Sequence, residues 1–113
     1  MSESQTANLA EPVSEQLSGI VLVWRQYDSS QSSAVAGSAV YQHIPKAAVE
    51  KYPGMGAGVI LQSATGNLLG VKYVYISDGT VTGNANNDSS EYTSSAGVKF
   101  TPRSWVLTDI YGE

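Results

Sequence analysis

The sequence has no cysteine, a single histidine and no long hydrophobic run. Without cysteine there is neither a disulfide framework nor a thiolate metal site. The longest apolar run, residues 20–24, is far too short to cross a bilayer, and the N-terminus lacks the basic and apolar regions of a signal peptide. We therefore expect no membrane span and no classical secretion.

Charged side chains are scarce as well, at 14% of positions, and the formal net charge is -4. This balance provides no basic stripe for phosphates, which argues against nucleic acid and anionic membranes as partners. Hydroxyl and amide side chains are abundant instead: 16 Ser, 7 Thr, 5 Asn and 6 Gln. The 113 residues, 42% of them hydrophobic, are enough for one domain. Such a composition is typical of an all-β extracellular or virion-surface module.

Residues 1–18 contain few large apolar side chains, three glutamates and a proline, which is typical of a flexible arm or attachment peptide. Leu9, Val13 and Leu17 recur every four residues, so the alternative is a short helix that forms on docking to a partner. We take residues 19–113 as the folded domain.

From residue 19 onward, short β-branched and aromatic runs alternate with turn residues. Pro45 at a helix N1 position predicts a short helix over residues 46–51. Asp78-Gly79 predicts a two-residue type I′ hairpin turn. The pattern indicates an antiparallel β-sandwich, jelly-roll or Greek-key-like, with strands near 20–24, 34–44, 59–63, 71–77, 80–82, 97–100 and 105–111.

A core between the sheets is expected to form from inward-facing apolar residues of these strands. In residues 20–24 and 105–107, a register slip of one residue would exchange the core-facing and outward-facing side chains. Which of two adjacent residues faces the core therefore stays open there. The predicted core residues are Ile20, Leu22, Val59, Leu61, Val74, Ile76, Val106 and Ile110.

The residues offer little for catalysis. His43 stands alone just before an X-Pro strand end, where a structural or surface role is more common than that of a base. A glycan hydrolase would need two facing carboxylates, and no motif forces such a pair among Asp28, Asp78, Asp88, Glu91 and Asp109. We expect no catalytic residues and no cofactor.

Metal binding has one weak candidate, the alternation of Asn84, Asn86, Asp88 and Ser90. The glycine and the terminal acidic residue of a calcium loop are missing, so a polar loop running in effect to Ala96 is the preferred interpretation, with no metal.

The ten aromatic rings are more informative. Trp24 and Trp105 lie in β-branched runs and are favoured as core residues. Tyr73 and Tyr75 alternate with Val74 and Ile76, so they face away from the core, either toward a ligand or as cross-strand pairs. The candidate ligand-binding residues are the two tyrosines for stacking and the polar loop for hydrogen bonds: Tyr73, Tyr75, Asn84, Asn86, Asn87 and Asp88.

Several short segments occur in a fixed order along residues 19–112: 19–24 with Tyr27, 43–46, 53–56, 72–78, 82–84 with Asn87, 97–100 and 105–107. Together they resemble the C-terminal domain of tail and baseplate proteins, the host-adhesion or receptor-binding proteins of siphophages that infect Gram-positive bacteria. The stretch 72–83 is the most specific part of the resemblance.

The resemblance implies a non-enzymatic β-rich module, exposed on a virion assembled in the host cytoplasm, that binds cell-wall saccharide. It also implies contacts with other virion proteins and presentation as a trimer or higher oligomer, which makes weak sugar contacts useful through multivalency. Such modules usually follow a long body, whereas 18 residues precede this one. The alternative is therefore a capsid or tail decoration protein that docks through its N-terminal arm and binds protein rather than sugar.

Overall fold

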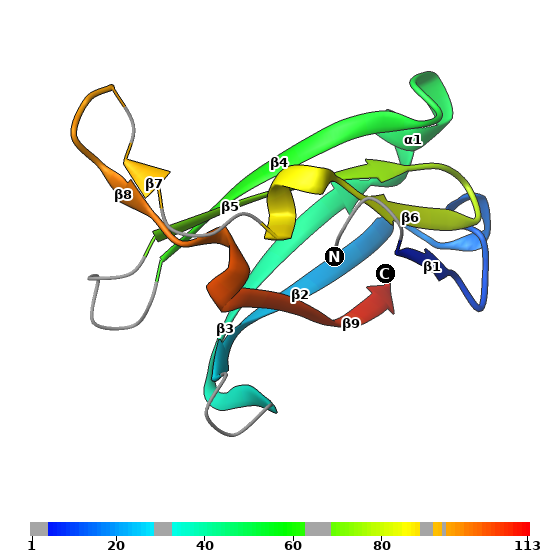
Figure 1. Cartoon of the computed structure of the whole chain (residues 1–113). Helices are drawn as coiled ribbons and strands as arrows, with labels where there is room; N and C mark the ends of the chain where they lie inside the picture. Colours follow the sequence, from blue (N-terminus) through cyan, green and yellow to red (C-terminus); the bar gives the residue numbers. More distant parts are fainter. Residues whose placement is uncertain (1–4, 29–32, 63–68, 89–91, 94) are drawn as a thin grey trace.

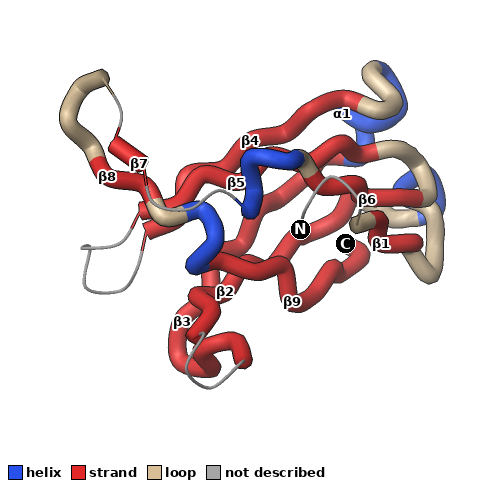
Figure 2. Tube along the Cα trace, viewed as in Figure 1, coloured by secondary structure: helices blue, strands red, loops and turns tan. Residues whose placement is uncertain are grey.

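A computed structural model of the chain describes residues 5–28, 33–62, 69–88, 92–93 and 95–113. Two antiparallel sheets make up most of the molecule (Figures 1 and 2). One has the strand order β1-β6-β5-β4 and the other β3-β2-β9. Because the buried apolar residues of both sheets form one cluster, the fold is an all-β sandwich, as predicted. The strands are β1 (Thr6–Asn8), β2 (Gly19–Asp28), β3 (Ser33–Pro45), β4 (Met55–Gln62), β5 (Leu69–Ile76), β6 (Thr80–Gly83) and β9 (Trp105–Gly112).

Short elements close the ends of the sandwich. The helix α1 (Lys46–Lys51) lies where the sequence predicts it, with Pro45 as its N-cap rather than its first helical residue. A small ladder of β7 (Tyr92–Thr93) and β8 (Lys99–Phe100) projects at the opposite end (Figure 1). Three 3-10 turns complete the described chain: η1 (Val13–Glu15), η2 (Ala85–Asp88) and η3 (Pro102–Ser104). No helix in the described part is long and apolar enough to span a membrane.

The core lies between the two sheets and matches most of the prediction. Val59 and Ile110 are half-buried and pack against it. Trp24 and Trp105 are both core residues, and Trp24 Nε1 donates to Gln42 Oε1 at 3.0 Å. The predicted residues that are fully buried are Ile20, Leu22, Leu61, Val74 and Ile76.

Val106 is the exception, and a β-bulge explains it. Val23 pairs with Asp109 while the next residue of β2, Trp24, pairs with Leu107, so Thr108 is an extra residue in β9. A bulge reverses the side-chain alternation beyond it. Leu107 therefore packs against the core together with Ile110, and the prediction of Val106 as a core residue is wrong.

The N-terminal segment belongs to the domain, which corrects the predicted arm of residues 1–18. β1 pairs with β6, from Thr6 opposite Thr82 to Asn8 opposite Thr80. Val13 is fully buried in the core, whereas Leu17 is 96% exposed. In the chain without a partner, the turn η1 forms within residues 9–17 in place of a helix, so the alternative of a helix that forms on docking stays a prediction. Residues 1–4 lie outside the described part.

The N-terminal segment also binds the hairpin between β5 and β6. Ser77 N donates to the carbonyl of Thr80 at 3.0 Å, so the two-residue turn lies at Asp78-Gly79 as predicted. Among the described glycines, positive φ occurs at Gly19, Gly54 and Gly97 and not at Gly79, which excludes the predicted type I′ turn. The turn is held instead from outside, because the Asp78 carboxylate accepts bonds from Ser14 N and Oγ.

Candidate functional site

The outer face of the four-stranded sheet carries the two predicted tyrosines. Residues of β5 alternate strictly, so Lys72, Val74 and Ile76 are buried while Tyr73 and Tyr75 are each 40% exposed. This confirms the predicted orientation of both tyrosines. Their ring centroids lie 5.4 Å apart with an interplanar angle of 81°, an edge-to-face contact that fixes the two rings relative to each other.

Two glycines of β4 form the floor beneath the Tyr73 ring. Gly58 is opposite Tyr73 and Gly56 is opposite Tyr75 in the antiparallel register. A Cβ built at Gly56 would collide with the phenol of Tyr73, whereas one at Gly58 would lie 3.4 Å from Tyr73 Cδ2. The Tyr73 ring therefore lies across the bare backbone of β4. Neither glycine is among the residues predicted for the site, although glycine spaced by two within a strand is a signal for close approach of another group.

Polar groups border the tyrosine pair on the other side, where the predicted irregular loop instead contains the turn η2. Asn84 Nδ2 donates to Tyr75 Oη at 3.0 Å, and Asn84 Oδ1 accepts from the backbone N of Asn86 at 2.9 Å. The structure thus joins Tyr73, Tyr75 and Asn84 in one group, with Asn86 exposed beside it. We call Tyr73, Tyr75 and Asn84 the tyrosine platform. The side chain of Asp88 lies outside the described part.

Asn87 has a structural role, which corrects its prediction as a ligand contact. It is 1% exposed, its Oδ1 accepts from Tyr73 N at 2.8 Å and its Nδ2 donates to Tyr73 O at 2.8 Å. The pairing of β5 with β6 ends at Val74 opposite Gly83, so the Asn87 amide takes the place of a neighbouring strand at Tyr73. A ligand cannot reach this buried amide.

Lys72 also holds η2 against β5, from the core-facing side of the sheet. It is 1% exposed, and its Nζ donates to the carbonyl of Asn87 at 2.6 Å. A buried ammonium requires such acceptors because desolvation of an unpaired charge is costly. Lys72 and Asn87 therefore fix η2, and with it Asn84, over β5.

Among the described residues of the four-stranded sheet, the outward positions around the tyrosine platform carry no charge. Thr82 of β6 lies opposite Tyr75 of β5 on one side and opposite Thr6 of β1 on the other. The hydroxyls of the two threonines lie 3.3 Å apart. On β4, Ile60 is 69% exposed opposite Val71. The surface thus combines aromatic faces, aliphatic carbon, hydroxyls and one amide, which suits a neutral ligand with both apolar and hydroxyl-bearing sides.

Of the other residues considered for chemistry, those whose side chains the structure describes do not converge on the tyrosine platform. His43 lies on the opposite sheet, where its Nδ1 is 2.9 Å from Glu113 Oε2. Asp78 is engaged by Ser14, and Asp109 is on β9. Glu91 and Ser90 lie outside the described residues, as does the side chain of Asp28.

Within the described ranges, no group of three or more His, Cys, Asp or Glu side chains is placed to hold a metal ion. Comparisons of the chain with protein-family models, with curated proteins and with solved structures found no match.

Proposed function

We propose that the chain is a non-enzymatic module that binds carbohydrate through the tyrosine platform. The observation that carries this proposal is the exposed edge-to-face pair of Tyr73 and Tyr75, with the Asn84 amide bonded to the Tyr75 hydroxyl. A tyrosine face packs on the apolar C–H side of a sugar ring, and the phenol and amide exchange hydrogen bonds with its hydroxyls. The uncharged surroundings favour a neutral saccharide.

We further propose that the module is part of a phage virion, in the tail or baseplate, and binds a saccharide of the Gram-positive host wall. The resemblance of residues 19–112 to siphophage adhesion domains supports this setting. One shallow site of this kind binds a sugar weakly, so the proposal includes a trimer or higher oligomer that engages several sites together. No cofactor takes part.

The test uses the full chain, because residues 5–18 are part of the domain. Tyr75→Ala removes one ring and the partner of Asn84, and we expect affinity for isolated wall polysaccharide to fall about tenfold, equivalent to about 1.4 kcal/mol. Tyr75→Phe keeps the ring and loses only the hydroxyl bond, so it retains an intermediate affinity. Binding is measured by glycan-particle pull-down and titration.

The matched control is Tyr52→Ala, which removes another exposed tyrosine, at the end of α1. Binding should be unchanged in this variant. Equal affinity of Tyr75→Ala and wild type, with both folded, would remove the carbohydrate assignment from the tyrosine platform.

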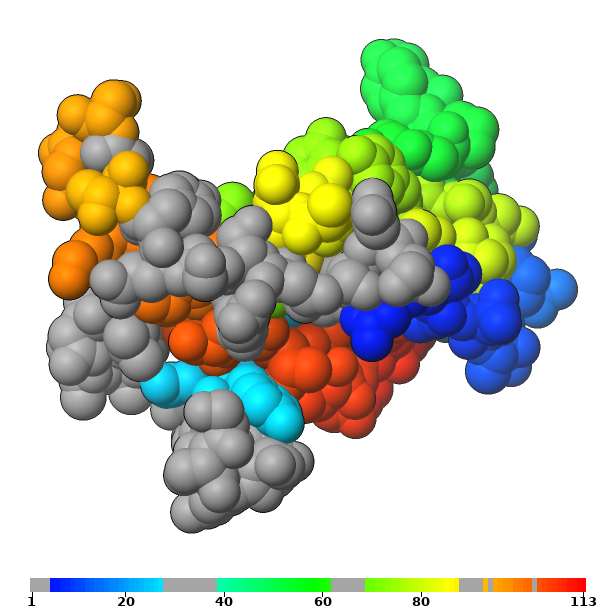
Figure 3. All heavy atoms as spheres, in the orientation of Figure 1, coloured from blue at the N-terminus to red at the C-terminus, as the bar shows by residue number. Residues whose placement is uncertain are grey.

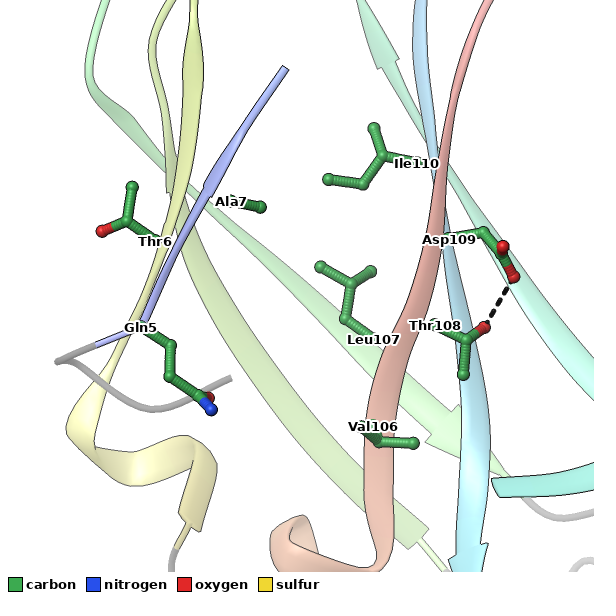
Figure 4. Close-up of a pocket in the computed structure, with 8 residues that line it drawn as sticks. All are labelled: Gln5, Thr6, Ala7, Val106, Leu107, Thr108, Asp109 and Ile110. Atoms are coloured by element: carbon green, nitrogen blue, oxygen red, sulfur yellow. Dashed lines mark hydrogen bonds between the residues drawn. The ribbon is translucent and has the colours of Figure 1, made fainter. Parts of the chain in front are cut away.

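A second candidate function, decoration through protein binding, is favoured by a groove along the open side of the sandwich. β1 and β9 are the outermost strands of their sheets and run side by side (Figure 3). Between them lies a space of about 710 Å³ into which Ala7, Leu107 and Ile110 point (Figure 4). An extended segment of another virion protein could pair with either strand edge and bury these side chains.

This candidate predicts that Ala7→Phe, which fills the groove, abolishes attachment to particles lacking the protein while saccharide binding persists. The opposite result, normal attachment by a folded Ala7→Phe variant, would exclude the groove as the docking site. The predicted docking through a free arm is replaced by docking at this groove, since residues 5–18 are folded onto the domain.

A further inference from the structure

The outer face of the three-stranded sheet has a hollow that the tyrosine platform does not share. Val21 faces outward at the centre of this sheet, with His43 opposite it on β3 and Tyr111 opposite it on β9. One row further along, Val23 is flanked by Tyr41 and Asp109. Neither valine belongs to the core cluster between the sheets. The three strands thus have an apolar centre, in which Val23 is fully buried and Val21 is partly accessible, between two polar and aromatic borders.

The borders of this face stand above its centre. Tyr41 is 63% exposed and Tyr111 50%, whereas Val21 is 9% exposed although it faces outward. Val21, Tyr41, His43 and Tyr111 line a space of about 530 Å³ together with Gly112 and Glu113. We call these six residues the valine hollow. Its volume lies within the usual range for small-ligand sites.

One end of the valine hollow is polar and fixed. His43 Nδ1 lies 2.9 Å from Glu113 Oε2, and both side chains are about half exposed. Glu113 is held by its backbone, since its N donates to Gly19 O at 2.9 Å and its carbonyl accepts from Ser18 N at 2.6 Å. With its main chain held and one carboxylate oxygen next to His43, Glu113 has fewer conformations to lose when it accepts a hydrogen bond from a ligand, which reduces the entropic cost of binding.

We propose that the valine hollow is a second saccharide-binding site, on the face of the sandwich opposite the tyrosine platform. A single sugar ring places its apolar side on Val21 between the Tyr41 and Tyr111 rings. Its hydroxyls donate to the Glu113 carboxylate and exchange hydrogen bonds with the His43 imidazole. The site uses none of the residues of the tyrosine platform, so it stands or fails independently of the function proposed for that platform.

The composition of the hollow disfavours other ligands. Glu113 and the nearby Asp109 on the same face would repel phosphate groups, which argues against nucleic acid and anionic polymers. A neutral sugar avoids this repulsion.

Two sites on opposite faces would make a single chain bivalent. If both engage one wall polymer, the second contact becomes intramolecular and the overall affinity rises without any new interaction. Loss of either site should then weaken binding to wall polysaccharide more than binding to a short oligosaccharide.

The test is a titration of the full ¹⁵N-labelled chain with N-acetylglucosamine oligomers and with cellobiose, followed by amide chemical shifts. We expect perturbations at residues 41–43 and 111–113 in addition to those at 73–75 and 84–86. Tyr111→Ala should lower the affinity measured at residues 41–43 and 111–113 about tenfold and leave the affinity measured at 73–75 and 84–86 unchanged. Tyr75→Ala should do the reverse.

Glu113→Gln keeps the size of the side chain and removes its charge, and it provides a second variant if Tyr111→Ala unfolds. It should likewise lower the affinity measured at residues 41–43 and 111–113. Perturbations confined to 73–75 and 84–86 would overturn the second site and leave the proposed function intact. Perturbations at 41–43 and 111–113 that both variants retain would also overturn it, and no perturbation with any probe would overturn both sites.

Discussion

The two outer faces of the sandwich carry tyrosines in different ways. On the four-stranded sheet, Tyr73 and Tyr75 come from one strand, and glycines of β4 let the Tyr73 ring lie down on the backbone. On the three-stranded sheet, Tyr41 and Tyr111 come from two strands that flank β2, with valine between them. The first pair is 40% exposed, and the second pair is more exposed. The residues of the floor therefore decide whether the same aromatic side chain forms a flat platform or the wall of a hollow.

The largest expected effect comes from removing residues 1–18, which strips β1 from the four-stranded sheet, Val13 from the core between the sheets and Ser18 from its bond to Glu113. Three paired residues, a fully buried valine and the Ser14 bonds to Asp78 are lost. We expect the free energy of unfolding to fall by about 4–6 kcal/mol, much of the stability of a domain this size. Urea unfolding measures this, with removal of residues 1–4 as the control. Unchanged stability without residues 1–18 would contradict this account and support the interpretation of these residues as a flexible arm.

Asn87→Ala should have the next largest effect and should act on the same face. It leaves the backbone N and O of Tyr73 without their side-chain partners, at a cost of about 2–4 kcal/mol. Asn86→Ala, at an exposed neighbour, should change stability by less than about 0.5 kcal/mol. Equal unfolding midpoints for the two variants would contradict the structural role of Asn87.

Gly56→Ala tests the glycine floor directly. The added Cβ would collide with the Tyr73 phenol and lift the ring, so binding at the tyrosine platform should fall about tenfold. Gly58→Ala, whose Cβ would lie 3.4 Å from the ring, should bind nearly as wild type. Calorimetric titration with wall polysaccharide distinguishes the two variants. Equal affinities would show that the floor does not shape the platform.

Glu113→Gln is expected to have the smallest effect on stability. Its pair with His43 is about half exposed, and ion pairs at such positions contribute about 0–1 kcal/mol. We expect a change of less than about 0.5 kcal/mol in thermal unfolding, together with weaker binding at the valine hollow. A large loss of stability would mean that the pair holds β3 and β9 in place.

Much of the four-stranded face follows from local pattern. The strict alternation over residues 71–77 predicts which side chains of β5 are buried, and Asp78-Gly79 predicts the hairpin that follows. The alternation also places Lys72 on the core side, but the partner of its ammonium and the burial of Asn87 do not follow from local pattern, because both depend on a turn that packs against a strand some 15 residues away in sequence. Tertiary contacts override the expectation that such polar residues are exposed.

The three-stranded face was harder to predict for two physical reasons. The bulge at Thr108 reverses the alternation of β9, which is why Leu107 and not Val106 faces the core. Tyr41 and Tyr111 are also 70 positions apart, so only the pairing of both strands with β2 brings them to one face. The prediction of a flexible N-terminal arm was wrong for a similar reason, since a three-residue strand carries no periodic signal.

The most direct test of carbohydrate binding compares the full chain with its Tyr75→Ala variant on intact Gram-positive cell walls, before and after chemical stripping of wall polysaccharide. We expect the wild type to bind intact walls and to lose binding on stripping, and we expect Tyr75→Ala to bind intact walls about tenfold more weakly than the wild type. Wild-type binding that survives stripping, or equal binding by the two chains, would contradict saccharide recognition by the tyrosine platform.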